Sequence, residues 1–331
     1  MYYTIDIMEK PFAIGIDVGG TKIAAALVDC HGHISARSFA LVPSDIDTEG
    51  VIALIGAAIA EARGDLSVDR IAGIGVAVPC FVDTEEQQLL HCVNLPLAGC
   101  NLRDRLTQST GLPVIMHNDA TLAVLGEERY GVARGLNHVL MITLGTGVGG
   151  GLFLDGKLFG GARGLAGEIG HITIVADGDP CPCGGKGHLE SYLGRAALAR
   201  KAQEAAAGPE GSGILKRAGG NVDDITAETL LEAAEAGDVC ALDILRQAGD
   251  LLGQALASFV NVLNPELIVI AGGLSQRASS LVEAARARLR EEWPPGIIDV
   301  TVATGQLGND AGILGAAALA FSPTVLDALA S

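Results

Sequence analysis

Two segments of the chain repeat one layout, and this repeat constrains the fold more than any other feature of the sequence. Each has an apolar strand, a glycine-rich tight turn and a second apolar strand, first in IGIDVGGTKIAAALVDCHG and again in MITLGTGVGGGLFLDGKL. Such turns expose several backbone N–H groups with no side chains in the way, and nests of this kind hold phosphate oxygens. The repeat therefore predicts a duplicated framework that holds phosphates from both sides.

The rest of the chain follows an α/β pattern, in which runs rich in Val and Ile alternate with longer stretches rich in Ala and Leu. The expected strands are 12–18, 22–29, 70–78, 113–117, 138–144, 150–155, 267–271 and 300–304. The expected helices are 48–63, 119–130, 189–206, 226–236, 239–262, 276–292 and 310–321. The 331 residues exceed one ordinary core, so two domains are expected.

Charge and hydropathy limit the partners of the chain. The 22 basic and 39 acidic residues give a formal net charge of −17, which argues against nucleic acid or an anionic membrane as the main partner. A small anionic ligand is still compatible, provided that backbone amides, a lysine or a metal ion receives it. The N-terminus lacks the apolar core of a secretory signal, and Gly, Pro or charge interrupts every long apolar run. We therefore expect a cytoplasmic protein that does not bind membranes.

The cysteines point to the same compartment. Their number is seven, which is odd, and five of them are scattered singly: Cys30, Cys80, Cys92, Cys100 and Cys240. This usage favours reduced, mostly buried thiols over a disulfide framework.

The first glycine turn carries groups suited to a nucleotide. Asp17 lies at a strand end, where a carboxylate can hold Mg²⁺, and Thr21 and Lys22 supply a hydroxyl and a cation for phosphate oxygens. Taken alone, the segment is better explained as a plain hairpin turn with a solvated lysine. The second turn at 145–151 and the segment IAGGLS at 270–275 favour the nucleotide interpretation. A Rossmann loop is a weaker match, because an alternating hairpin pattern rather than a helix follows Gly150.

Asn118 and Asp119 end one expected strand and begin the next helix. Asp is a preferred N-cap residue, so Asp119 can simply cap the helix. In the alternative, its carboxylate lies at the edge of the sheet where α/β proteins bind ligands, and takes the proton from an attacking hydroxyl. The stretch alone favours the cap.

A cluster of possible metal ligands lies between residues 171 and 190. Cys181 and Cys183 form a C-x-C pair, His188 follows five residues later, and His171 lies ten residues upstream of the pair. Two thiolates and two imidazoles suit tetrahedral Zn²⁺, and a closed shell of four protein ligands is typical of structural zinc. Reduced thiols beside ordinary surface histidines are the simpler alternative. A bound zinc ion would fix the loop that brings Glu168, His171 and Glu190 together.

Six motifs occur in an order and spacing that resemble the ROK family of sugar kinases. They are IGIDVGGTK, HNDAT, LGTGVGGG, GLAGEIGH, CPCGGKGHLE and GNDAGILGAA, and they cover roughly residues 13–320. The resemblance implies a two-lobed, actin-like (ribonuclease H-like) ATPase/hexokinase fold with a structural zinc site. The small α/β lobe is expected at 1–118 with a C-terminal helix at 312–331, and the large α/β lobe with the zinc-binding loop at 119–311.

The resemblance also implies roles for single residues, with ATP and Mg²⁺ between the lobes and Asp119 as the catalytic base. The ATP site would contain Asp17, Gly19, Gly20, Thr21, Lys22, Gly145, Thr146, Gly147, Gly149, Gly150, Gly272 and Gly273. The sugar would be bound by Asn94, Asn118, Asp119, Glu168, His171 and Glu190. Zinc would be held by His171, Cys181, Cys183 and His188, although the family usually has a cysteine at the position of His188.

The activity that the resemblance implies is ATP-dependent phosphorylation of a hexose at its 6-hydroxyl, with glucose as the expected sugar. Kinases of N-acetylglucosamine, N-acetylmannosamine, fructose or allose are alternatives within the family. A sugar-binding regulator without catalysis is a further alternative, but only about a dozen residues precede AIGIDVGG, which is too few for a DNA-binding domain. A homodimer is expected from the family.

Overall fold

The computed structural model of the chain describes residues 10–83, 85–92, 95–292 and 300–321. Their contacts form two compact units, and each is described by itself. The first contains the described residues of 1–137, 151–167 and 309–331, and the second contains those of 138–150 and 168–308. The lobe boundaries expected from the sequence stay a prediction, and part of the helix expected at 312–331 lies outside the described residues.

The first unit is built on a five-stranded sheet with the order β3-β2-β1-β4-β7. Its strands are β1 (Phe12–Val18), β2 (Lys22–Asp29), β3 (Ile34–Leu41), β4 (Ile71–Val78) and β7 (Val114–Asn118). The first three strands are antiparallel, and β4 and β7 continue the sheet in parallel. β1 and β4 lie in the centre and are mostly buried, which explains why their sequences are apolar except for Asp17 near the end of β1.

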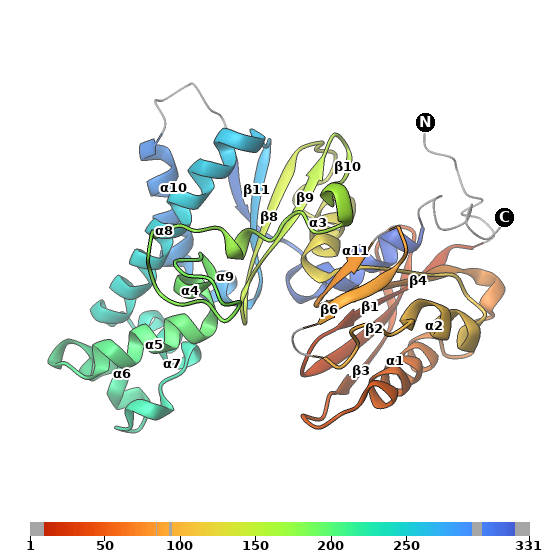
Figure 1. Cartoon of the computed structure of the whole chain (residues 1–331), viewed down its shortest axis with the longest axis horizontal. Coiled ribbons are helices and arrows are strands. Elements are labelled where there is room, and N and C mark those ends of the chain that lie inside the picture. The colour runs from red at the N-terminus through yellow and green to blue at the C-terminus, as the bar shows by residue number, and fades with distance from the viewer. Residues whose placement is uncertain (1–9, 84, 93–94, 293–299, 322–331) are drawn as a thin grey trace. The chain divides into compact units, whose positions relative to one another are not determined.

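Helices cover both faces of this sheet (Figure 1). α1 (Thr48–Arg63) packs on β2 and β3, and its buried side chains join the core formed by Ile14, Ile16 and their neighbours. α11 (Ala311–Ala320) packs on β1 and β4 across the other face. A Cβ at Gly15 or Gly75 would overlap backbone atoms of α11, so these glycines allow the helix to approach the sheet closely.

The second sheet has the order β10-β9-β8-β11-β12. Its strands are β8 (Val139–Leu144), β9 (Val148–Leu154), β10 (Lys157–Leu158), β11 (Leu267–Ala271) and β12 (Thr301–Thr304). A glycine turn joins β8 to β9 as another joins β1 to β2, and β11 runs parallel to β8 and β12. The two strand orders correspond position by position, which confirms the duplicated framework.

The remaining elements are helices and one hairpin. The longest helices of the second unit, α8 (Val239–Leu263) and α10 (Ser279–Glu292), pack along each other. The other strands and α-helices are β5 (Cys80–Asp83), β6 (Gln88–Cys92), α2 (Leu102–Thr110), α3 (Asp119–Tyr130), α4 (Glu190–Leu193), α5 (Arg195–Ala206), α6 (Ser212–Arg217), α7 (Ala227–Glu235) and α9 (Gly273–Arg277). No helix of the described residues is both long and apolar enough to cross a membrane.

The prediction that all the isolated cysteines are reduced is wrong for one pair. Cys80 and Cys92 form a disulfide with a Cα–Cα distance of 4.3 Å. They face each other across the antiparallel pair β5 and β6. The sequence gives no sign of the bond, because polar residues obscure the hairpin that brings the two thiols together.

Candidate active site and metal centre

The first glycine turn joins β1 to β2 and presents polar side chains to solvent. The amide of Gly19 donates to the carbonyl oxygen of Lys22 at 2.8 Å, which closes the turn. Gly20, Thr21 and Lys22 are exposed. The Lys22 ammonium lies 5.3 Å from the ring centroid of Phe39 on β3, within the range of a cation–π contact. The turn therefore offers amides, a hydroxyl and a cation to an anion.

Asp17 lies on β1 just before this turn, beside the first turn of α11. A Cβ at Gly312 would be 3.4 Å from its carboxylate, so the acid lies within van der Waals reach of this helix turn. Burial, with the charge of Asp119 as the second cause, raises the pKa of Asp17 to about 7, and Lys22 partly offsets the rise. The two carboxylates are therefore close enough to repel each other. Such a pair offers the oxygen ligands that Mg²⁺ prefers.

Asn118 and Asp119 have different positions at the start of α3. The Oδ1 atom of Asn118 accepts hydrogen bonds from the amides of Ala120 and Thr121, at 3.0 and 3.2 Å, and so caps the helix. Asp119 is the first helical residue, and its Oδ1 accepts from the amide of Ala120 at 2.8 Å. Burial raises the pKa of the Asp119 carboxyl. The alternative in which Asp119 provides the N-cap is therefore wrong, because Asn118 holds that position.

His117 supports this pair from the end of β7. Its side chain is buried, and burial lowers the pKa of the imidazole to about 4, so the ring is neutral near pH 7. Its Nδ1 atom accepts a hydrogen bond from the amide of Asn118 at 2.8 Å, which requires an unprotonated Nδ1. The imidazole thus fixes the backbone at the point where the strand passes into α3.

The second glycine turn is tied to Glu190. The amide of Gly145 donates to the carbonyl oxygen of Gly147 at 3.0 Å, and the amide of Val148 donates to Oε2 of Glu190 at 2.9 Å. A Cβ at Gly147 would overlap this carboxylate. Thr146 is exposed, and Gly149 and Gly150 lie within β9. Glu190, which is expected to bind the sugar, is therefore hydrogen-bonded directly to a turn that is expected to bind phosphate.

Gly272 and Gly273 form a third turn at the carboxyl end of β11. Gly272 has φ +93°, which side-chain-bearing residues rarely adopt, and a Cβ there would overlap backbone atoms of Leu144. Because Leu144 is the last residue of β8, this turn lies directly beside the 145–147 turn. The carboxyl ends of β8 and β11 therefore bring two glycine turns to one edge of the sheet.

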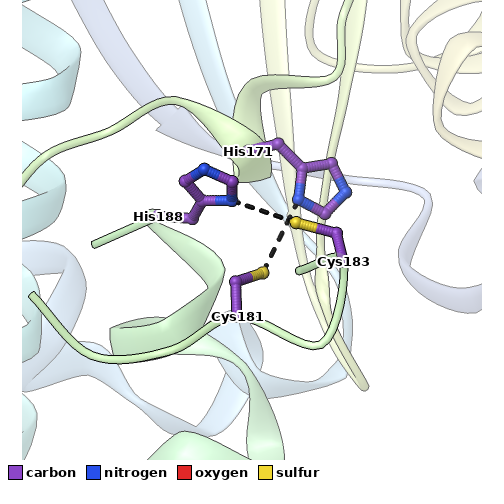
Figure 2. Close-up of side chains that lie close together, drawn as sticks. All are labelled: His171, Cys181, Cys183 and His188. Carbon is purple, nitrogen blue, oxygen red and sulfur yellow. Dashed lines mark hydrogen bonds between the residues drawn. The ribbon is translucent and has the colours of Figure 1, made fainter. Parts of the chain in front are cut away.

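The four expected zinc ligands gather at one point (Figure 2). The ligand atoms of His171, Cys181, Cys183 and His188 all lie within 4.8 Å of one another. Cys181 Sγ is 3.9 Å from His171 Nδ1, and Cys183 Sγ is 3.2 Å from His188 Nδ1. Two sulfurs and two imidazole nitrogens at this separation fit a tetrahedral zinc ion. His188 therefore contributes the fourth ligand atom of this group.

His171 has one ring nitrogen for each of its two expected roles. Its Nδ1 faces Cys181, whereas its Nε2 lies 4.0 Å from Oε2 of Glu168. A metal ion on Nδ1 leaves Nε2 to a carboxylate or a sugar hydroxyl, and such a partner also fixes the ring orientation. The structure thus brings Glu168 and the metal cluster together through one imidazole.

Sequence comparison identifies the family of the chain. The sequence model of the ROK family matches residues 13–322. The chain belongs to the ROK family. It is 36% identical over 321 residues to a glucokinase from Halalkalibacterium halodurans, covering 93% of this chain and 94% of that protein. It is also 36% identical over 317 residues to a glucokinase from Streptomyces coelicolor, covering 94% of this chain and 98% of that protein.

Among solved structures, a ROK family glucokinase from Streptomyces griseus in complex with glucose and AMPPNP resembles this ROK-family chain. The TM-score is 0.82 at 35% sequence identity, and the match covers 93% of this chain and 98% of that one. The two-lobed, actin-like fold class expected from the motifs is thereby confirmed.

Two residues near the expected site of this ROK-family chain, His117 and Arg195, were not predicted from the sequence. His117 is a neighbour of two expected site residues, but a lone histidine in a strand carries no signal of its hydrogen bond. Arg195 touches both turns of the second unit through contacts distant in sequence. Asn94 lies outside the described residues.

Proposed function

We propose that this ROK-family chain is a glucokinase, which transfers the γ-phosphoryl group of ATP to the 6-hydroxyl of glucose. The family and the relatives named glucokinase support the activity. The observation that carries the chemistry is the start of α3. Asn118 caps the helix, so the half-buried carboxylate of Asp119 is available as a proton acceptor beside Asp17.

In this mechanism Asp119 orients the 6-hydroxyl and accepts its proton during transfer. Burial raises the pKa of the carboxyl, which makes it a stronger base than a solvated aspartate. Asp17 would hold Mg²⁺, and the bound ion would neutralise charge on the phosphates. The amides of both glycine turns and the side chains of Thr21 and Lys22 bind phosphate oxygens. Most of the rate enhancement comes from positioning and charge stabilisation, as in phosphoryl transfer generally.

The sugar is bound by acceptors that the metal loop positions. Glu168 and His171 lie beside the metal cluster, and Glu190 is fixed by its bond to the second glycine turn. We assign the remaining contacts to Asn118 and Asn94. Zn²⁺ at His171, Cys181, Cys183 and His188 would be structural, because four protein ligands leave no coordination position for substrate.

The wider organisation is inferred from the family resemblance. We propose a small lobe at 1–118 with a C-terminal helix at 312–331, a large lobe at 119–311, a homodimer and a cytoplasmic location. The Cys80–Cys92 bond weighs against the cytoplasm, where disulfides are rare.

A coupled assay tests the activity. Purified protein, ATP, Mg²⁺ and glucose should yield ADP and glucose 6-phosphate in equal amounts, the latter detected with glucose-6-phosphate dehydrogenase. Protein that binds glucose in calorimetry but forms no glucose 6-phosphate would instead be a sugar-binding regulator, and the kinase proposal would be wrong.

A further inference from the structure

Arg195 reaches two glycine turns at once. It is the first residue of α5, and its amide lies 3.3 Å from the carbonyl oxygen of Gly145 and 3.2 Å from that of Thr146, donating to both. Its guanidinium lies on the other turn, since a Cβ at Gly273 would be 3.3 Å from Nη2. The backbone of Arg195 is thus attached to one turn while its charge lies against the other.

The two turns share an edge at which α/β proteins bind ligands. β8 and β11 are parallel neighbours, with Thr143 opposite Ala271, and a glycine turn follows the carboxyl end of each strand. Ligands of such sheets bind outside the carboxyl ends of the strands. A ligand bound to both turns would therefore lie close to the guanidinium of Arg195.

Glu228 holds the guanidinium from α7. Nη1 of Arg195 forms an ion pair with Oε1 of Glu228, which lies in the first turn of that helix. The two side chains are 38% and 45% exposed. An ion pair this exposed contributes little to folding, so its members can be replaced without unfolding the protein. Its clearest consequence is to orient a planar cation beside Gly273.

We propose that Arg195, oriented by Glu228, binds the nucleoside part of ATP. This contact determines how strongly the binding of ATP depends on its nucleoside. The inference rests on the proposed kinase function. The 145–147 turn offers amides to phosphate oxygens, and the guanidinium of Arg195 lies beside Gly273 on the neighbouring turn, where the nucleoside of a nucleotide bound to both turns would lie. A guanidinium has a flat face that stacks on a base and donors that reach ribose oxygens. A lysine would keep the charge of Arg195 but lose both properties.

The test compares ligands that share phosphates but differ in the nucleoside. Binding of ADP, adenosine and tripolyphosphate to the full chain would be measured by calorimetry for the wild type, Arg195→Gln, Arg195→Lys and Glu228→Gln. We expect Arg195→Gln to weaken ADP and adenosine by roughly 5- to 30-fold, and to leave tripolyphosphate within about twofold. Arg195→Lys should lose nearly as much affinity for ADP and adenosine as Arg195→Gln, and Glu228→Gln should lose less. In steady-state kinetics, Arg195→Gln should raise KM for ATP rather than KM for glucose.

Lys201→Gln provides the matched control, because Lys201 forms an exposed ion pair with Glu204 on the same helix, away from both turns. It should bind every ligand as the wild type does. Unchanged ADP affinity in Arg195→Gln would overturn the inference, and so would an equal loss for tripolyphosphate, which would indicate a phosphate contact. Wild-type protein without glucose phosphorylation would refute the proposed function, whereas the ADP and adenosine comparison would still decide the role of Arg195.

Discussion

At the scale of single residues, the site depends on which of two adjacent side chains caps α3. Asn and Asp are almost equally good N-caps, so the sequence could not assign the role. The structure assigns it to Asn118 and leaves Asp119 beside Asp17. The division is physically sensible, because an amide supplies the cap without adding a third negative charge.

This division predicts that Asp119→Asn strongly lowers the turnover number but leaves the protein folded. The amide cannot accept the proton of the sugar hydroxyl, so kcat should fall by roughly 100-fold or more. The melting temperature should stay within a few degrees of the wild type, because Asn118 still caps the helix. Asp47→Asn, which alters the exposed cap of α1, should leave kcat unchanged. A folded Asp119→Asn enzyme with most of its turnover would show that the carboxylate is only structural.

Asp17 should cost stability at neutral pH. Its pKa is about 7 in the folded chain and near 3.8 in the unfolded chain, so the folded state retains a proton that the unfolded state releases. The contribution of this proton to the free energy of unfolding is fully present below pH 3.8, and it is lost as the pH rises through about 7. The Asp17→Asn variant lacks this loss. The difference between its free energy of unfolding and that of the wild type should therefore shift in favour of the variant by roughly 1–2 kcal/mol from pH 5.5 to 8.

Urea unfolding of both proteins without Mg²⁺ would measure this difference. Asp17→Asn should also lose phosphoryl transfer, because an amide is a poor ligand for Mg²⁺ compared with a carboxylate. Parallel stability curves across this pH range would mean that Asp17 titrates normally.

At the scale of elements, the strands that the sequence predicted are mostly those with two covered faces. β4 and β11 consist of continuous apolar residues, and β1 is apolar except for Asp17, because these strands are covered on both sides. β3 was missed because its outer face carries Ser, Arg and Phe, with Phe39 68% exposed. The helix expected at 189–206 breaks at Gly194, which is extended at ψ 155° and separates α4 from α5. That break places Arg195 against the glycine turn.

The site was predictable where its residues adjoin strand ends, and not where it depends on long-range contacts. The glycine turns and the four metal ligands stand in short motifs with a recognisable chemistry. The bond between Glu190 and the amide of Val148 joins residues 42 positions apart. No local pattern encodes such a contact, because it arises only when α4 packs on the turn.

The metal loop should hold about one Zn²⁺ per chain, as a set of four ligands implies. Cys181→Ser should lose the metal and weaken glucose binding by roughly tenfold or more, because His171 and the neighbouring Glu168 would no longer be fixed. Cys240→Ser changes a partly buried thiol on α8 outside the cluster and should keep both properties. Metal analysis and glucose titration check the prediction, and active protein free of zinc would contradict it.

At the scale of the whole molecule, a duplicated sheet carries two different chemistries. Both copies contribute a glycine turn that can bind phosphate. The first adds the carboxylates of Asp17 and Asp119, and the second adds the metal loop with Glu168 and His171. Under the proposed function, the repeated glycine turns would serve the nucleotide, and the features in which the two copies differ would serve the acceptor.

The acceptor should be glucose in preference to related sugars. Glu168 and Glu190 are hydrogen-bond acceptors, which suit several hydroxyls pointing into one pocket, and one oxygen of Glu190 is already bonded to Val148. An acetamido sugar would replace one hydroxyl by an N–H and a bulky methyl group. Sites that pair a hydroxyl reject analogues lacking it by orders of magnitude, so kcat/KM should be highest for glucose. Side-by-side assays with N-acetylglucosamine, N-acetylmannosamine, fructose and allose measure this. Clear preference for any of the four would refute the assignment to glucose while leaving the sugar-kinase activity intact.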